Sequence, residues 1–411
     1  MNSNDQPRPA PGSPSRWFTF IPLRYQAADS WWQRDMGLLC LGFRAWGVDS
    51  RFVLLPGPDG PPQADAAKPF ILASPEQLAD PAWWTQWKLD GVVAVTWALP
   101  QHEPVVRAIK QAGIRLAIKL DMGGDRTPRG NFLRYLQVRR VVLHDQGAKA
   151  AGLQAFFRTL LPWLWPKPFA AAAVRHLRYA DKLLIETPGA REQFARFLQV
   201  AGAPELVERT RLVPHPVTTD MVLAPGAPRQ QLILSVGRWD SMQKDTPKMI
   251  AVLAAVLAEY PGCRARLIGG GGPAVENLLR TVPAEIRSRI EYAGRVPHEE
   301  LPAHYRAAQV FLCTSWHESF NIAAAEALCC GCSVVGPADI ASMVYFAGAR
   351  SGTPAASRSV AGFQAALRTE LEAWASGGRD PLAISVYWRD RLHADRVAAT
   401  ILETMAGGQP A

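Results

Sequence analysis

The segment HESFNIAAAEAL, late in the chain, carries two acidic side chains, Glu318 and Glu326. The apolar run VFLCT precedes it and good helix formers follow it, so Ser319 or Asn321 is a candidate N-cap. Eight residues of helix would separate the two carboxylates by roughly 12 Å. That is about the span of a nucleoside diphosphate sugar, so the two carboxylates could accept hydrogen bonds from hydroxyls at both of its ends. The alternative is one surface glutamate and one that packs the helix.

The start of this predicted helix also suits an anion. Helix N-termini present free N–H groups and the positive end of the helix dipole. In α/β proteins they lie at the carboxyl ends of strands, where ligands bind. We therefore expect a phosphate beside the start of this helix.

Two further segments contain cations or glycines directly after predicted strands. The first, VGRWDSMQKD, contains Gly237, which permits a sharp exit from the strand, and the cations Arg238 and Lys244. A guanidinium and an ammonium can bind one diphosphate if the loop folds over it, although most loop cations are simply solvated. The second, GGGGP at residues 269–273, lets backbone approach a phosphate closely. It matches neither the Rossmann fingerprint nor a P-loop, and a plain turn is the alternative.

Alternating apolar runs and helical patterns supply the elements that would position these groups. Such alternation implies βαβ units and parallel sheets, and two sets of units imply two doubly wound domains. The expected strands span residues 51–55, 91–97, 115–120, 141–144 and 182–186 in the first set, and 232–236, 265–268, 290–292, 310–313 and 333–336 in the second. The expected helices span residues 36–46, 104–112 and 190–201, then 248–259, 274–281, 299–307, 322–330 and 360–374.

Breaks in this pattern set the expected domain boundaries. Residues 1–15 are polar and rich in Pro and Ser, which predicts a flexible tail. The first domain is expected over residues 16–217 and the second over 230–380, because the stretch between them contains Pro and Gly without a strong period. Residues 381–411 follow another Gly-rich break and are amphipathic.

Composition excludes several classes of protein. A chain of 411 residues with 48% hydrophobic and 20% charged residues is an ordinary globular protein of two or three domains, neither a small module nor a disordered chain. No apolar leader and no uncharged run of about 20 apolar residues is visible, so we expect a cytoplasmic protein. Six cysteines in such a protein predict reduced thiols. A zinc site is not expected, because no second ligand pair at zinc spacing accompanies the three cysteines at residues 329, 330 and 332.

The positive charge gathers in one stretch. Residues 115–178 hold twelve Lys and Arg against three acids, in a chain whose net charge is +9. Within that stretch the run LLPWLWPKPF combines aromatic rings with cations, as a patch on an anionic membrane surface would. Nucleic acid is not an expected partner, because no known nucleic-acid motif accompanies the patch. The alternative is a proline-shaped loop whose arginines are solvated.

The order of the glycine, cation and glutamate segments resembles that of a known family. Residues 230–340 are similar to the donor-binding domain of retaining GT-B glycosyltransferases of family 4, the glycosyl transferases group 1 type. The resemblance rests on Gly237, Arg238 and Lys244, on GGGGP, on the two glutamates separated by seven residues, and on EALCCGCSVVG. It implies the GT-B fold, which is two Rossmann-like domains facing a cleft, with a C-terminal helix over residues 381–411 that crosses back to the first domain.

The resemblance also implies an activity. Members of the family move a sugar from a nucleotide sugar, with retention of configuration, and here the expected acceptor is a glycan or a lipid-linked molecule of the cell envelope. A site at the inner face of the membrane would fit such an acceptor. The family usually needs no metal, and the chain contains no Asp-x-Asp, so we expect no metal and no cofactor besides the nucleotide sugar.

Residue roles follow from the resemblance. Arg238 and Lys244 would bind the donor diphosphate and stabilise the leaving group. Glu318 would contact the sugar ring and Glu326 the ribose hydroxyls. Asp121 stands where the acceptor domain usually has a histidine, and it is a candidate catalytic residue or a simple turn residue. Further donor contacts are expected from Gly237, Gly271, Gly272, Arg295, Phe320, Asn321 and Ile322.

Three departures from the family pattern keep other functions open. Asn321 stands at the last position of the usual Glu-x-Phe-Gly, residues 28–32 replace a Gly-Gly loop, and Asp121 replaces the histidine. A non-catalytic binding protein could have kept the cleft and lost turnover. A nucleotide-sugar epimerase of the same architecture is a less favoured alternative.

Overall fold

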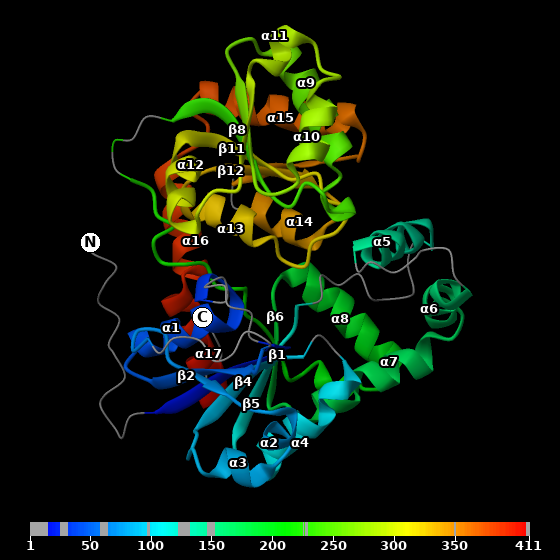
Figure 1. Ribbon diagram of the computed structural model, residues 1–411, viewed down its shortest axis with the longest axis vertical. Coiled ribbons are helices and arrows are strands. Elements are labelled where there is room, and N and C mark those ends of the chain that lie inside the picture. The colour runs from blue at the N-terminus through cyan, green and yellow to red at the C-terminus, as the bar shows by residue number, and fades with distance from the viewer. Residues whose placement is uncertain are drawn as a thin grey trace.

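Two parallel sheets organise the chain into two stacked domains, the first at the bottom of Figure 1 and the second at the top. The computed structural model describes residues 15–24, 32–57, 65–96, 99–121, 132–145, 153–224, 226, 229–348 and 351–407, with backbone alone for 23–24 and 153–158. Helices cover the sheets, which confirms the predicted α/β fold with two Rossmann-like domains.

The first domain is built on a seven-stranded parallel sheet in the order β3-β2-β1-β4-β5-β6-β7. The order reverses between β1 and β4, the kind of switch point at which doubly wound sheets bind ligands. The strands are β1 (Arg16–Arg24), β2 (Asp49–Leu55), β3 (Phe70–Leu72), β4 (Gly91–Val95), β5 (Arg115–Lys119), β6 (Lys182–Ile185) and β7 (Thr210–Leu212). The α-helices are α1 (Asp35–Ala45), α2 (Pro75–Leu78), α3 (Pro81–Thr85), α4 (Glu103–Gln111), α5 (Phe132–Asp145), α6 (Leu153–Leu164), α7 (Pro166–Val174) and α8 (Pro188–Ala201).

The second domain is built on a six-stranded parallel sheet in the order β10-β9-β8-β11-β12-β13, which reverses between β8 and β11. The strands are β8 (Gln230–Val236), β9 (Arg264–Ile268), β10 (Ile290–Gly294), β11 (Ala308–Leu312), β12 (Ser333–Pro337) and β13 (Gly352–Ala355). The α-helices are α9 (Thr246–Glu259), α10 (Gly272–Leu279), α11 (Ala284–Arg287), α12 (Leu301–Ala307), α13 (Ile322–Cys329), α14 (Ala341–Ala347), α15 (Val360–Ala375), α16 (Pro381–Leu392) and α17 (Ala394–Ala406). A 3-10 turn, η5 (Met242–Lys244), follows β8.

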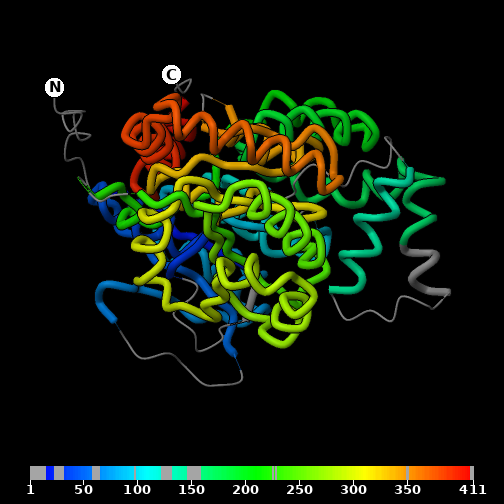
Figure 2. The backbone as a smooth tube through the Cα atoms, turned by 90° about the horizontal axis from the view of Figure 1, so that it is seen from above, coloured from blue at the N-terminus to red at the C-terminus, as the bar shows by residue number. Residues whose placement is uncertain are grey.

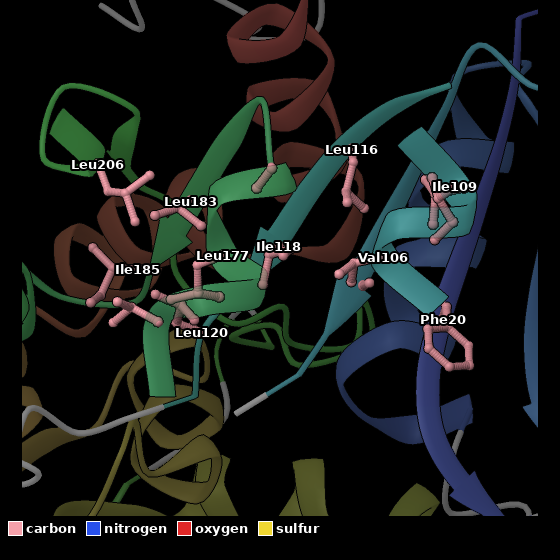
Figure 3. Packing of buried hydrophobic residues seen from close by; sticks show 14 of the residues in the cluster. Phe20, Val106, Ile109, Leu116, Ile118, Leu120, Leu177, Leu183, Ile185 and Leu206 are labelled. Carbon is pink, nitrogen blue, oxygen red and sulfur yellow. The ribbon is translucent and has the colours of Figure 1, made fainter. Parts of the chain in front are cut away.

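Apolar residues two apart in the strands form the core of the first domain. Leu116 and Ile118 of β5 point to one face of the sheet, because side chains alternate along a strand. Val106 and Ile109, three apart on α4, belong to the same buried cluster. Figure 3 shows these side chains meeting Leu183 of β6 in one continuous apolar layer.

The predicted strand at residues 141–144 is wrong, because these residues form the last turn of α5. The run VVLH is too short to separate a strand from a buried helix segment by its hydrophobicity alone. Val138 and Val141 are both buried and three residues apart, which is helical spacing. Strands β1, β3, β7 and β13 lie outside the predicted set, and the last three are edge strands of three or four residues.

The C-terminal segment returns to the first domain as two helices rather than one. Helix α16 packs on α13 of the second domain, and α17 packs on α1 of the first. His393 joins them and pairs with Val217 in an isolated parallel bridge. The approach to α1 is close, since a Cβ on Gly42 would lie 2.2 Å from the carbonyl oxygen of Ala394. Among the described residues, no helix has the length and apolarity that crossing a membrane requires.

Candidate active site

A cleft of about 430 Å³ collects most of the predicted site residues at one place. Both domains line it: the ends of β5 and β7 and the start of α1 from the first, and the ends of β8 and β11 from the second. The predicted residues at the cleft are Asp121, Gly237, Arg238, Lys244, Glu318, Phe320, Asn321 and Ile322. From the first domain, three residues that the sequence analysis does not single out also line it, namely Arg34, Asp35 and His215.

Lys244 and Glu318 form an ion pair on the wall of the cleft. Lys244 Nζ donates to Glu318 Oε1 at 2.7 Å, and Ser315 Oγ donates to the same oxygen at 2.6 Å. Burial alone would lower the pKa of Lys244, but the negative charge of Glu318 outweighs it and raises the pKa. The cleft therefore holds a charged ammonium beside a carboxylate, which suits a ligand with both phosphate and hydroxyl groups.

Asn321 explains one departure from the family pattern. Its backbone is left-handed, with φ +67°, at the position where the family usually has glycine. Asparagine tolerates this conformation better than other residues with a side chain. Its side chain also caps α13, because Oδ1 accepts from the N–H of Ala324 at 3.1 Å. Of the two candidate N-caps, Asn321 is thus the one used, and the first turn of α13 opens on the cleft.

The loop after β8 brings Gly237 and Arg238 to the same cleft. A Cβ on Gly237 would lie 3.3 Å from Lys244 Cε, so glycine leaves room for the lysine stem. Arg238 is exposed at the cleft, where its guanidinium is accessible to an anion. The predicted cations thus share one opening, although they stand six residues apart in sequence.

The first domain contributes a histidine held between two acids. His215 is buried, and its Nδ1 lies 2.8 Å from Asp35 Oδ1 while its Nε2 lies 3.6 Å from Asp121 Oδ1. Burial would raise the pKa of Asp35, but the hydrogen bond and charge of His215 outweigh it, so the pKa is lowered. Its place between Pro214 and Pro216 was the only signal for His215 in the sequence, because β7 before it was not predicted.

Four predicted donor-binding residues do not line this cleft. A Cβ on Gly271 would lie 2.5 Å from the backbone nitrogen of Asp240, so this glycine is needed for packing against the loop after β8. Gly272 begins α10. Arg295 lies against Gly270, because a Cβ on Gly270 would be 3.1 Å from Arg295 Nε.

Glu326 is the fourth residue outside the cleft. Its Oε2 accepts from the Tyr305 hydroxyl at 2.8 Å, and its Oε1 lies 3.2 Å from His298 Nε2. The hydrogen bond to Glu326 raises the pKa of His298, which favours an imidazolium. This carboxylate is therefore hydrogen-bonded inside the second domain, and its contact with ribose hydroxyls stays a prediction.

Metal-binding groups do not cluster in the described part of the chain, where no three His, Cys, Asp or Glu residues could hold an ion. All six cysteines are free and buried. Burial raises the pKa of the Cys40 thiol to about 12, which keeps it protonated and unreactive.

Comparison with known proteins identifies a family resemblance in the second domain. Residues 230–372 match the family model for glycosyl transferases group 1. This match covers most of the second domain and about a third of the chain. The matched residues include the ion pair, the glycine loop and α13, so the predicted family resemblance is confirmed.

Curated relatives of this group 1 domain act on mannose and inositol compounds by name. A GDP-mannose:cellobiosyl-diphosphopolyprenol alpha-mannosyltransferase of Xanthomonas oryzae is 32% identical over 126 residues, which is 30% of this chain and 33% of the relative. A D-inositol 3-phosphate glycosyltransferase of Streptosporangium roseum is 28% identical over 251 residues, 54% of this chain and 51% of the relative. The chain thus spans between a third and a half of these relatives.

Solved structures share the fold across nearly the whole chain. Anabaena HepE, solved in complex with UDP, has a TM-score of 0.64 at 15% identity and covers 95% of this chain and 99% of its own. Sucrose-phosphate synthase from Thermosynechococcus elongatus has a TM-score of 0.63 at 16% identity, with 95% and 98% covered. The group 1 domain is therefore half of a GT-B architecture.

Proposed function

We propose that the protein is a glycosyltransferase that moves a sugar from a nucleotide sugar to an acceptor hydroxyl. The observation that carries the proposal is the buried Lys244–Glu318 pair at the start of α13, which faces Asp121 of the first domain across one cleft. A cation for phosphate, a carboxylate for sugar hydroxyls and an opposing polar wall are what a transfer between two bound molecules needs.

The donor side is proposed to stabilise the leaving group. Breaking the bond between the sugar and the diphosphate leaves negative charge on phosphate oxygen. Lys244, Arg238 and the free N–H groups at the start of α13 can stabilise that charge in a partly water-excluded site. Glu318 would hold a sugar hydroxyl, and no metal is needed in this scheme because the cations are supplied by side chains.

The acceptor side is proposed to need only positioning. In a retaining, front-face transfer the acceptor oxygen bonds to the anomeric carbon as the phosphate leaves, and the acceptor proton passes to the departing phosphate oxygen. No strong base is then required. Asp121, 3.6 Å from His215, can orient the acceptor hydroxyl by accepting a hydrogen bond.

The acceptor is proposed to be a glycan or lipid-linked molecule of the cell envelope. One named relative acts on a diphosphopolyprenol-linked sugar. Among the described residues, five of the eight exposed large hydrophobic side chains lie on α5–α7, and exposed Arg140 and Lys167 accompany them. We infer that this surface rests on an anionic bilayer. The five side chains are Phe132, Leu133, Leu164, Trp165 and Phe169.

Nucleotide binding tests the proposal first. UDP, GDP, ADP and dTDP are each added in a thermal-unfolding assay, and one of them at 100 times its Kd should add about 2.7 kcal/mol to stability. The matching nucleotide sugar should then slowly release nucleoside diphosphate, and NMR of the product should show a retained anomer. If none of the four raises the melting temperature, the proposal is wrong. Binding without any turnover on envelope extracts would instead support the non-catalytic binding protein.

A further inference from the structure

Helix α5 reaches from the first domain to the loops that carry the donor-site ion pair. Figure 1 shows α5 away from the β1–β7 sheet and level with the lower edge of the second domain, and Figure 2 shows it in a lobe that projects to one side. Its C-terminal residue is Asp145. The carboxylate of Asp145 accepts hydrogen bonds from Ser241 Oγ at 2.6 Å, from the N–H of Met242 at 2.9 Å and from the N–H of Gln243 at 3.1 Å.

These contacts fix the turn that carries Lys244. The turn η5 has three residues, Met242–Lys244, so two of its three backbone N–H groups point at one carboxylate from the other domain. Burial would raise the pKa of Asp145, but the hydrogen bonds from Ser241, Met242 and Gln243 help to lower it, so the carboxylate is charged. A charged acceptor makes each of these hydrogen bonds stronger than a neutral one would.

The other end of α5 holds the loop that leads to Glu318. Arg134 donates to the carbonyl oxygen of Trp316, two residues before Glu318, and its Nε lies 3.1 Å from Asp339 Oδ2. The N–H of Trp316 in turn donates to the carbonyl oxygen of Gln243 at 2.8 Å. The Lys244 turn and the Glu318 loop are therefore bonded to each other and to the same helix.

The sequence of α5 suits this docking. Arg134, Val138, Val141 and Asp145 follow the spacing i, i+4, i+7, i+11, which places them on one face of a helix. Both valines are buried, with 7% and 2% of their surface exposed. Eleven residues of helix separate the two charged ends by roughly 16 Å.

We propose that Asp145 is a positioning residue for the donor diphosphate. It acts from the first domain by holding the Lys244 turn, while Arg134 holds the Glu318 loop, so that the ion pair is ready for the ligand. The proposal rests on the proposed function, since it concerns the same donor. The competing explanation is that α5 fastens the two domains together without any effect on the donor site.

Hydrogen exchange tests the contact without a ligand. Asp145→Ala should speed amide exchange of a peptide covering residues 241–250 about tenfold, because one charged acceptor lost from two N–H groups is worth more than about 1.4 kcal/mol. Asp80→Ala is the matched control, since Asp80 also caps a helix in the first domain by accepting from the N–H of Ala82 at 2.9 Å. The control should leave this peptide unchanged. Unchanged exchange in Asp145→Ala would overturn the proposal.

Nucleotide binding tests the role at the donor site. Calorimetry with UDP, GDP, ADP and dTDP selects the probe, and Asp145→Ala should weaken its binding about tenfold, with partial rescue in Asp145→Asn. In a Lys244→Ala background the same change should cost less than about twofold, because Asp145 acts through the lysine turn. Equal losses of affinity in both backgrounds, or no loss in either, would show that α5 only holds the two domains together. If the parent binds no nucleotide, the proposed function fails, and fast exchange in Asp145→Ala would still show the contact.

Discussion

The buried Lys244–Glu318 ion pair is expected to contribute more to ligand binding than to the stability of the fold. The two side chains are 17% and 8% exposed and lie 2.7 Å apart. Buried ion pairs add little net stability, because the loss of hydration offsets the attraction between the charges. Removing one partner is different, since it leaves the other charge buried alone. The pair is thus better explained by the ligand it can bind than by the fold it stabilises.

Lys244→Ala should lower turnover of the nucleotide sugar by a factor of about 10² to 10³, the usual effect of losing one group that stabilises a leaving anion. It should also lower the free energy of unfolding by about 3 kcal/mol, because Glu318 is left unpaired in a buried site. Release of nucleoside diphosphate and urea unfolding measure the two effects.

Lys110→Ala is the control for that variant. Lys110 Nζ lies 2.8 Å from Asp181 Oδ2, a similar distance, but the two side chains are 30% and 40% exposed. Its loss should cost less than about 1 kcal/mol and leave turnover unchanged. Similar losses in both variants would show that the Lys244 pair is an ordinary structural contact.

His176 should make the fold sensitive to acid. Burial lowers its pKa to about 4, and its Nε2 lies 2.9 Å from Thr96 Oγ1. The folded state therefore favours the neutral imidazole, whose contribution is full above the unfolded pKa near 6.5 and is lost as the pH falls towards 4. Between pH 7 and 4.5 the loss should be about 2 to 3 kcal/mol. Urea unfolding of the parent and of His176→Gln at both pH values measures it, and an equal pH dependence of the two would contradict it.

At the scale of elements, the junctions between strands and helices shape the site. The loop after β9 crosses the loop after β8 so closely that a Cβ on Gly269 would lie 1.8 Å from the carbonyl oxygen of Gly237. Gly269 also has φ +127°, which residues with a side chain rarely adopt. The glycine run therefore brings two loops together, and this packing in turn sets the position of Arg238.

Substitutions at Asn321 test how the start of α13 is stabilised. Asn321→Gly should lower the free energy of unfolding by only a few tenths of a kcal/mol, because glycine accepts φ +67° and caps helices adequately. Asn321→Ala should cost about 2 kcal/mol, since it loses the cap and keeps the left-handed backbone. Thermal unfolding of the two variants gives the comparison. An alanine variant as stable as the glycine variant would show that neither cap nor conformation matters here.

At the scale of the whole molecule, the apolar surface of α5–α7 is set apart from the two sheets. Figure 2 shows the α5–α6 lobe projecting beside the body of the molecule. Trp165 and Phe169 are 59% and 46% exposed on it. A bilayer contact there would place the proposed lipid-linked acceptor near the first domain, and α5 would connect that surface to the loops that carry Lys244 and Glu318.

Replacing both Trp165 and Phe169 with serine should release the protein from vesicles that contain phosphatidylglycerol. Co-sedimentation should fall at least about tenfold, because each buried aromatic side chain contributes about 1.5 to 3 kcal/mol. Vesicles of phosphatidylcholine alone should bind both forms weakly. Leu382 and Val386, 60% and 52% exposed on α16, are replaced with serine as the control. Equal release by both double variants would argue against a membrane face on α5–α7.

The sequence by itself determined those features of the fold and the site that depend on residues close together in the chain. Alternating apolar runs are enough to predict parallel strands and crossing helices, because a parallel sheet buries both of its faces. The order of Gly237, Lys244 and Glu318 was enough to predict the resemblance to glycosyl transferases group 1, since each follows a strand of the second sheet. The departure at Asn321 was visible too, although its φ of +67° needed the structure.

Only the tertiary structure decided which distant residues meet. Asp35 and His215 are 180 residues apart in sequence, and they reach one cleft because the ends of different elements of the first domain face the second sheet. The docking of Asp145 on the Lys244 turn crosses from one domain to the other, so no local pattern could reveal it. The spacing of apolar residues indicates which face of a helix or strand is buried. Contacts between loops depend instead on how the two sheets lie relative to each other.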